Sequence, residues 1–398
     1  MGMHNSIRAM LFLSAAVAVL PATLAQAEDF HGFDPDSFNG AMLSNDQLQA
    51  MVKDAATHQK PRGGDKIVVG FANLQRDIVF CQKVEQSLLK NAQAAGIELV
   101  VSDNRLDGAT ALANAQSFLQ RNVDYVIEFQ TDANFGATIM QQMNDANTKV
   151  TAIDIPMPGA SFFGANNPRS GFMGGSYLAQ AAAKLKGADA VKQGYLVVGE
   201  LPQSGAIPAM RTNGQVAGFL AVAGPDFPKD HIIKIDTKNT REESFAQMTN
   251  VLPRIPDGVP IMVTAINDQS ASGMLRAVQQ AGREKDLIAV GMGADETETL
   301  VKEKALVASV GYFPERYGNY LVPLALMSLA GKTLPPSTVM NHVMVTKANV
   351  CEFYSDFKCD PNGAAVDYKF PQQAYETYVQ SLRADPELKD YQALIPAK

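Results

Sequence analysis

The chain has 398 residues and a formal net charge of -7, with 46% hydrophobic residues and no cluster of basic side chains. This acidic balance argues against nucleic acid and against anionic membrane surfaces as partners. The length exceeds one average domain and favours about two.

The first residues have the order of a secretory signal peptide. Arg8 precedes an apolar run over residues 9–20, and Ala25-Gln26-Ala27 supplies small residues for cleavage. An N-terminal membrane anchor is the alternative, but the run is short and Pro21 interrupts it. We therefore expect residues 1–27 to be removed, which would leave a periplasmic protein with no direct membrane insertion.

Residues 28–65 form a polar N-terminal extension. Within it, Ser44 followed by Gln47 predicts a helix start with a capping box. The stretch "KPRGGDK" then reads as a linker into the first strand. We assign no function to this extension.

From residue 66, strand-like and helix-like segments alternate. The strand-like runs are "KIVVGFA", "IELVVSD", "YVIEFQTD" and "KVTAIDI", then "GYLVVGEL", "HIIKID", "PIMVTAIND", "LIAVGMGA" and "ALVASVGYF". Between them lie amphipathic stretches, such as residues 77–95 and 269–281. This alternation predicts parallel sheets with helices on both faces. Residues 155–170 have no helical period, so we expect them to connect one α/β lobe to a second.

Three cysteines remain after export. Cys351 and Cys359 lie in a polar, aromatic, loop-like stretch, and we expect them to form a disulfide. Cys81 lies on the apolar face of a predicted helix and is expected to be buried.

Ligands of open parallel sheets bind beyond the carboxyl ends of the strands. The polar residues at those ends are Asn73, Arg76, Asp103, Asn104, residues 130–132, Asp154, Glu200, Asn267, Asp268 and Asp295. Carboxylates, amides and a guanidinium suit a neutral hydroxylated ligand, and Phe129 and Phe163 could add apolar ring faces. Asp154 stands apart because no helix follows it that it could cap.

Sequence signals for catalysis are weak. No phosphate-binding loop and no G-x-S-x-G motif occurs, and the five histidines are scattered, so neither a metal site, a cofactor nor a catalytic triad is expected. Asp154 and Asp268 could form the carboxylate pair of a glycoside hydrolase. The amides beside each of them favour binding over catalysis.

The order of several motifs resembles the periplasmic sugar-binding proteins of ABC importers, in the ribose- and galactose-binding cluster. These motifs are "KIVVGFANLQRDIVF", "VTAIDIP", "FFGANNPRSGFMGG", "VTAINDQSASG" and "AVGMGADETETL". The resemblance implies two Rossmann-like lobes joined by three strands, crossing near residues 164–167, 312–314 and 341–346. It places residues 66–164 and 313–342 in one lobe, and residues 165–312 and 343–398, including a C-terminal extension, in the other.

The same resemblance implies binding residues. Asp154 and Asn267 match positions that bind sugar in the family, and Arg76 and Phe129 fall where first-lobe contacts are made. Further candidates are Asn73, Tyr312, Asp268 and, in place of the family's second-lobe arginine, Arg211, with Asn213 and Gln215 as alternatives. Three positions depart from the family pattern, namely Ile155, Gly293 and Tyr312, and the chain has no tryptophan to stack on a sugar ring.

We therefore expect a non-enzymatic, monomeric solute receptor that delivers a monosaccharide or polyol to an ABC permease. A periplasmic sensor that presents its ligand to a histidine kinase or chemoreceptor is the alternative, since its cleft would be the same. A repressor of the same fold is disfavoured, because the predicted signal peptide occupies the place of a DNA-binding headpiece.

Overall fold

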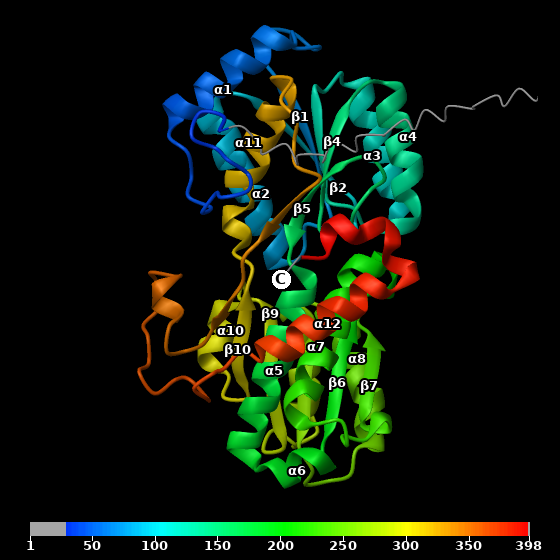
Figure 1. Ribbon diagram of the computed structural model, residues 1–398, viewed down its shortest axis with the longest axis vertical. Helices are drawn as coiled ribbons and strands as arrows, with labels where there is room; N and C mark the ends of the chain where they lie inside the picture. Colours follow the sequence, from blue (N-terminus) through cyan, green and yellow to red (C-terminus); the bar gives the residue numbers. More distant parts are fainter. Residues whose placement is uncertain (1–28, 397–398) are drawn as a thin grey trace, which may run out of the picture.

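The computed structural model describes residues 29–396, which form two lobes stacked along the long axis of the molecule (Figure 1). Each lobe contains a six-stranded sheet, in the orders β11-β5-β4-β3-β1-β2 and β12-β10-β9-β8-β6-β7. All neighbouring strands run parallel except β10 and β12. The predicted pair of α/β lobes is confirmed, whereas the predicted signal peptide, residues 1–27, lies outside the described residues.

Lobe 1 is the part built on the first of these sheets. Its strands are β1 (Val68–Asn73), β2 (Glu98–Asp103), β3 (Tyr125–Glu128), β4 (Lys149–Ile153), β5 (Ser161–Ala165) and β11 (Ser337–Met340). Its helices are α1 (Asn45–His58), α2 (Val79–Ala95), α3 (Gly108–Gln120), α4 (Gly136–Asp145) and α11 (Tyr317–Leu329). Helices α1, α2 and α11 share one apolar core, and α3 and α4 help to enclose the other.

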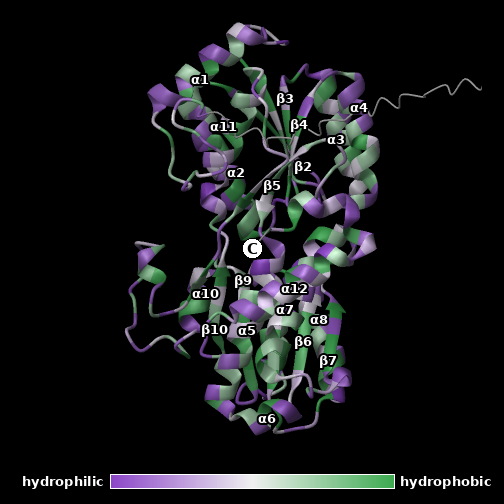
Figure 2. Ribbon diagram, in the orientation of Figure 1, coloured by the Kyte–Doolittle hydropathy of each residue, from purple (hydrophilic) through white to green (hydrophobic). Residues whose placement is uncertain are grey.

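Lobe 2 is the part built on the second sheet. Its strands are β6 (Tyr195–Glu200), β7 (Ile232–Asp236), β8 (Ile261–Ala265), β9 (Leu287–Gly293), β10 (Leu306–Gly311) and β12 (Val343–Val345). Its helices are α5 (Asn167–Lys186), α6 (Ala188–Gln193), α7 (Ala206–Ala223), α8 (Arg241–Val251), α9 (Asp268–Gln280) and α10 (Thr297–Lys302). Figure 2 shows hydrophobic strands inside both lobes and hydrophilic residues along the outer helices.

The chain crosses between the lobes three times, as expected: from β5 to α5, from β10 to α11 and from β11 to β12. The expectation of a bare connection over residues 155–170 is wrong in one respect. Residues 161–165 form strand β5, which pairs with β4 and with β11 before the chain crosses. Asn166 then caps α5 through a hydrogen bond from the Arg169 amide to its Oδ1.

Both extensions are folded. The predicted capping box at Ser44 is present at the start of α1, which packs on lobe 1. At the other end, Cys351 and Cys359 form the predicted disulfide, and Cys81 is a buried free thiol.

The C-terminal segment, residues 372–395, consists of α12 (Gln372–Ala384) and the 3-10 helix η7 (Pro386–Leu394). Its apolar side chains share a cluster with Phe162 of lobe 1 and with Phe172 of lobe 2. The Ser337 hydroxyl of β11 donates a hydrogen bond of 2.9 Å to the carbonyl of Ala393. The sequence places this segment with lobe 2 alone, but in the structure it contacts both lobes and lies at their junction (Figure 1).

Candidate functional site

A cavity of about 60 Å³ lies between the lobes, at the carboxyl ends of the strands. Ten of its fifteen lining residues are apolar or aromatic and five are polar. The apolar and aromatic ones are Leu74, Ile78, Phe80, Phe129, Ile155, Leu201, Pro208, Ile266, Met292 and Tyr312. The polar ones are Asp154, Ser204, Arg211, Asn239 and Asn267.

Asp154 supplies the only carboxylate of this lining. It follows β4 in a left-handed backbone conformation, with φ at 55°, and its Oδ1 accepts a hydrogen bond of 3.0 Å from the Ala165 amide. No hydrogen bond from residues 29–396 reaches its Oδ2. Burial raises the pKa of Asp154, while the positive charge of Arg211 and the Ala165 amide act in the opposite direction.

Arg211 projects from α7 of lobe 2 and is 9% exposed. Its Nε donates to Asn167 Oδ1 at 2.9 Å, and its Nη1 donates to the Ile266 carbonyl at 2.8 Å. The guanidinium carbon lies 4.8 Å from the centre of the Tyr312 ring. These contacts, together with a side-chain hydrogen bond between Arg211 and Tyr312, orient the guanidinium at the cavity wall.

Two glycines of α5 set the position of α7, the helix that carries Arg211. A Cβ atom on Gly171 of α5 would lie 1.9 Å from the Arg211 carbonyl oxygen, and one on Gly175 would lie 1.8 Å from that of Gln215. Only glycine therefore allows α5 and α7 to approach so closely. The "GFMGG" sequence of α5 thus fixes the depth at which Arg211 enters the cavity.

Two asparagines of lobe 2 that line the cavity form a chain of hydrogen bonds to lobe 1. Asn267 caps α9, with its Oδ1 accepting from the Ser270 amide at 2.8 Å, and its Nδ2 donates to Asn239 Oδ1 at 2.7 Å. Asn239 in turn donates from Nδ2 to Gln75 Oε1 of lobe 1 at 2.9 Å. The two lobes are therefore hydrogen-bonded to each other beside the cavity.

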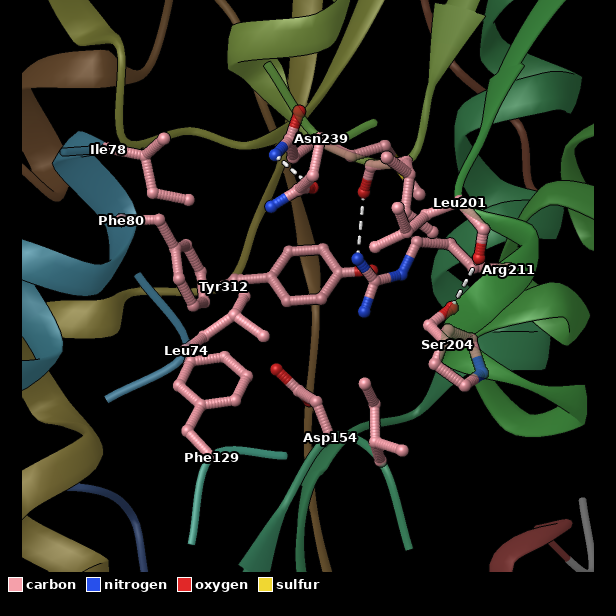
Figure 3. Close-up of a pocket in the computed structure, with 15 residues that line it drawn as sticks. Leu74, Ile78, Phe80, Phe129, Asp154, Leu201, Ser204, Arg211, Asn239 and Tyr312 are labelled. Carbon is pink, nitrogen blue, oxygen red and sulfur yellow. Dashed lines mark hydrogen bonds between the residues drawn. The ribbon is translucent and has the colours of Figure 1, made fainter. Parts of the chain in front are cut away.

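Five of the eight predicted site residues line this cavity: Asp154, Asn267, Phe129, Tyr312 and Arg211. Figure 3 shows the side chains of Asp154 and Arg211 directed toward the cavity from opposite sides, beside the ring of Tyr312. The two other candidates for the second-lobe position lie elsewhere. Asn213 accepts a hydrogen bond from Lys234, and Gln215 is buried against the Ala265 carbonyl.

The remaining three predicted residues are not among those that line the cavity. The Arg76 side chain is 51% exposed and donates from Nε to Glu85 Oε2 at 2.8 Å. Asn73 is fully buried and donates to the same Glu85 oxygen at 3.0 Å.

Asp268 likewise forms its hydrogen bonds within its own lobe, lobe 2. It accepts hydrogen bonds from the Ser309 hydroxyl at 2.6 Å and from the Asp295 amide at 3.0 Å. Burial raises its pKa to about 6, against the effect of the Ser309 hydrogen bond, and the charge of Glu296 raises it further. Asp154 and Asp268 therefore do not face one cavity together, as the carboxylate pair of a glycosidase would.

Of the three positions that depart from the family pattern, Gly293 and Tyr312 have a structural explanation. A Cβ atom on Gly293 would lie 1.9 Å from Asp295 Oδ1, so the carboxyl group of Asp295 fills the space that a side chain at position 293 would need. The Tyr312 hydroxyl donates to Ser170 at 2.7 Å, which turns its ring toward the cavity. Phe163, which the sequence suggests as a ring face, packs instead against Tyr317 and Tyr320.

Sequence reasoning missed Asn239, Ser204 and most of the apolar lining. Asn239 lies in the loop after β7 with φ at 60°, and only its position in a "KNT" turn before α8 could have drawn notice. Within residues 29–396 there is no group of three or more metal-ligating side chains that could hold an ion. Nor is any helix in that range long and apolar enough to cross a membrane.

Comparison with known proteins identifies relatives along most of the chain. The profile of the periplasmic binding protein domain matches residues 69–333. The ribose import binding protein RbsB of Salmonella typhimurium is 27% identical over 305 residues, which cover 75% of this chain and 97% of that protein. RbsB of Escherichia coli matches with the same identity and coverage.

Solved structures share the fold. The Caulobacter myo-inositol binding protein matches with a TM-score of 0.62 at 22% identity and covers 75% of this chain and 98% of its own. An Agrobacterium vitis solute-binding protein bound with α-D-tagatopyranose has a TM-score of 0.62 at 16% identity, covering 74% and 100%. The matched profile, which covers residues 69–333, is that of a binding-protein domain and not of a hydrolase, so the glycoside hydrolase alternative is not supported. The chain belongs to the periplasmic binding protein family.

Proposed function

We propose that this protein captures a small neutral sugar or polyol between its lobes in the periplasm and delivers it to an ABC importer. The observation that carries the proposal is that Asp154 of lobe 1 and Arg211 and Asn267 of lobe 2 line one cavity. A ligand that bridges these groups stabilises the closed arrangement of the lobes, which is how a hinged receptor signals that it is loaded.

The proposed binding set is Asp154, Arg211, Asn267, Phe129 and Tyr312, to which we add Asn239. Asp154 accepts a hydrogen bond from a ligand hydroxyl and Arg211 donates one to a ligand oxygen, while the aromatic rings cover apolar faces of the ligand. Of the other predicted residues, Arg76 and Asn73 both bind Glu85 of α2. We propose that these two residues support the cavity from outside its lining in lobe 1, as Asp268 does in lobe 2.

The proposed partner is the permease of an ABC importer, approached by a monomeric protein after removal of residues 1–27. Similarity to ribose import binding proteins favours this partner over a sensor kinase or chemoreceptor. Uptake of labelled ligand that depends on this protein would support the importer. Light scattering of the purified protein should give the mass of one chain.

A thermal-shift screen tests the binding function directly. Pentoses, hexoses, deoxy sugars and polyols are compared with amino acids and nucleosides. A ligand at 100 times its dissociation constant adds roughly 2.7 kcal/mol to stability, which is easily seen as a rise in melting temperature. A response confined to amino acids or nucleosides would contradict the proposal.

A further inference from the structure

The cavity offers few polar atoms to a ligand. Among residues 29–396, only Oδ1 of Asp154 accepts a hydrogen bond from the protein, whereas Arg211 already hydrogen-bonds Asn167, the Ile266 carbonyl and the Tyr312 side chain. In Asn239 and Asn267, the side-chain oxygen already accepts a hydrogen bond and one amide hydrogen is already donated. The Ser204 hydroxyl donates to the Leu201 carbonyl at 2.7 Å. The site can therefore satisfy only a small number of ligand hydroxyls.

The rest of the wall is apolar on both sides. Leu74, Ile78 and Phe129 face the cavity from lobe 1, and Leu201 faces it from lobe 2 (Figure 3). A ligand hydroxyl pressed against these side chains would lose its hydrogen bonds to water and gain none. Such an unsatisfied polar group costs roughly 1–3 kcal/mol. An alkyl group at the same place would gain by its burial.

The charges and the size of the cavity restrict the ligand further. Asp154 and Arg211 contribute one charge of each sign and form no direct ion pair in the described part of the chain, so the carboxylate can accept from a ligand hydroxyl and the guanidinium can donate to a ligand oxygen. A neutral ligand leaves this balance undisturbed. The cavity measures about 60 Å³, whereas one water molecule needs roughly 10–15 Å³. A compact ligand is therefore favoured.

We infer that the cavity selects a compact, neutral, partly deoxygenated alcohol, such as a deoxy sugar or a short alkane diol, over a fully hydroxylated sugar. This inference rests on the proposed function and narrows its ligand class. The selectivity comes from the apolar wall, and Asp154 and Arg211 together anchor one end of the ligand.

The test is calorimetric titration of the purified protein with four matched pairs. Each pair differs by one hydroxyl at the same configuration: glycerol and 1,2-propanediol, D-ribose and 2-deoxy-D-ribose, D-galactose and D-fucose, D-mannose and D-rhamnose. We expect the deoxy member to bind roughly 5- to 150-fold more tightly in every pair that binds, the range that 1–3 kcal/mol implies. Tighter binding of the fully hydroxylated members would overturn the inference and leave the proposed function standing. Failure of all eight compounds to bind would count against both.

A pair of variants checks that the wall is the cause. Leu201→Asn places an amide in the wall, and we expect the preference for the deoxy member to shrink at least fivefold. Leu185→Asn makes the same change on α5 at a side chain that is 52% exposed and outside the cavity, and it should leave the preference unchanged. An unchanged preference in the Leu201 variant would contradict the inference.

Discussion

The side-chain amide of Asn239 in lobe 2 donates a hydrogen bond of 2.9 Å to Gln75 Oε1 in lobe 1. Asn239 also lines the cavity and accepts from Asn267. One side chain is therefore shared between the cavity wall and the contact between the lobes, so we expect it to couple occupancy of the cavity to closure.

Gln75→Ala should weaken ligand binding. The substitution deprives the Asn239 side-chain amide of its acceptor in lobe 1, and one neutral hydrogen bond contributes about 0.5–1.5 kcal/mol. We expect a dissociation constant roughly 2- to 12-fold higher by calorimetry. Gln82→Ala is the control, because Gln82 donates to Arg76 within lobe 1. Equal affinities of both variants and the wild type would show that the Gln75 contact does not hold the lobes closed.

Asp154→Asn should reduce affinity more strongly. The substitution keeps an oxygen for the Ala165 amide and tolerates the left-handed backbone at position 154, so the fold is preserved. It removes a charge-assisted hydrogen bond worth about 1.5–3 kcal/mol, which corresponds to roughly 10- to 150-fold in affinity. Asp103→Asn, at the end of β2 and outside the cavity lining, should bind as the wild type does. Retained affinity in the Asp154 variant would remove this carboxylate from the site.

Glu128→Gln should stabilise the protein at alkaline pH. Burial raises the pKa of Glu128 from 4.5 to about 8, and the hydrogen bond from Asn104 only partly opposes this. Between these two pH values the unfolded chain is ionised at this position and the folded chain is not. The unfolded state therefore binds fewer protons, and stability falls as pH rises until it levels off above about 8.

The measurement for Glu128 is the melting temperature at pH 5 and at pH 8. The advantage of the glutamine variant over the wild type should grow between the two. Glu98→Gln, at an exposed position of β2, should track the wild type. Parallel curves for the Glu128 variant and the wild type would refute the pKa shift.

Replacement of Cys351 and Cys359 by serine should lower stability without changing ligand affinity. The bond closes a short loop of sequence separation 8, and the loop lies outside the cavity lining. Cross-links of this size contribute about 2–3 kcal/mol. Dithiothreitol should lower the melting temperature of the wild type toward that of the double variant and leave the double variant unaffected. A wild type insensitive to the reductant would contradict this.

Leu388→Ala should destabilise the protein by about 2–5 kcal/mol, the usual cost of a cavity at a buried leucine. Leu388 is 6% exposed in η7, within the cluster shared by the two lobes. Lys389→Ala changes the adjacent exposed residue and should cost little. Equal melting temperatures of the two variants would mean that η7 adds nothing to the folded state.

The two α/β lobes could be predicted from the sequence because strands and helices follow from the local alternation of apolar and polar residues. The run of β-branched residues before Asp154 and the absence of a following helix identified that residue as a cleft residue, and it does line the cavity. Strand β5 escaped prediction because it follows a Gly- and Pro-punctuated stretch and pairs with β11, which lies far away in the sequence. Its pairing depends on contacts that local periodicity does not report.

Side-chain direction explains what the sequence missed in the site. Arg76 follows a strand end as a binding residue would, but its guanidinium turns to Glu85, which lies nine residues later on α2. Asn239 reaches the cavity through a left-handed backbone in a loop. Both outcomes depend on three-dimensional neighbours, so residue type and spacing alone could not give them.

The C-terminal segment, residues 372–395, affects how the two lobes can move relative to each other. A hinge rotation changes the distance between Phe172 in lobe 2 and Ser337 in lobe 1, and residues 372–395 contact both regions. Close-packed apolar clusters do not stretch. We therefore expect an opening rotation to shear this cluster or to detach one end of residues 372–395 from its lobe, so that these contacts oppose wide separation of the two halves.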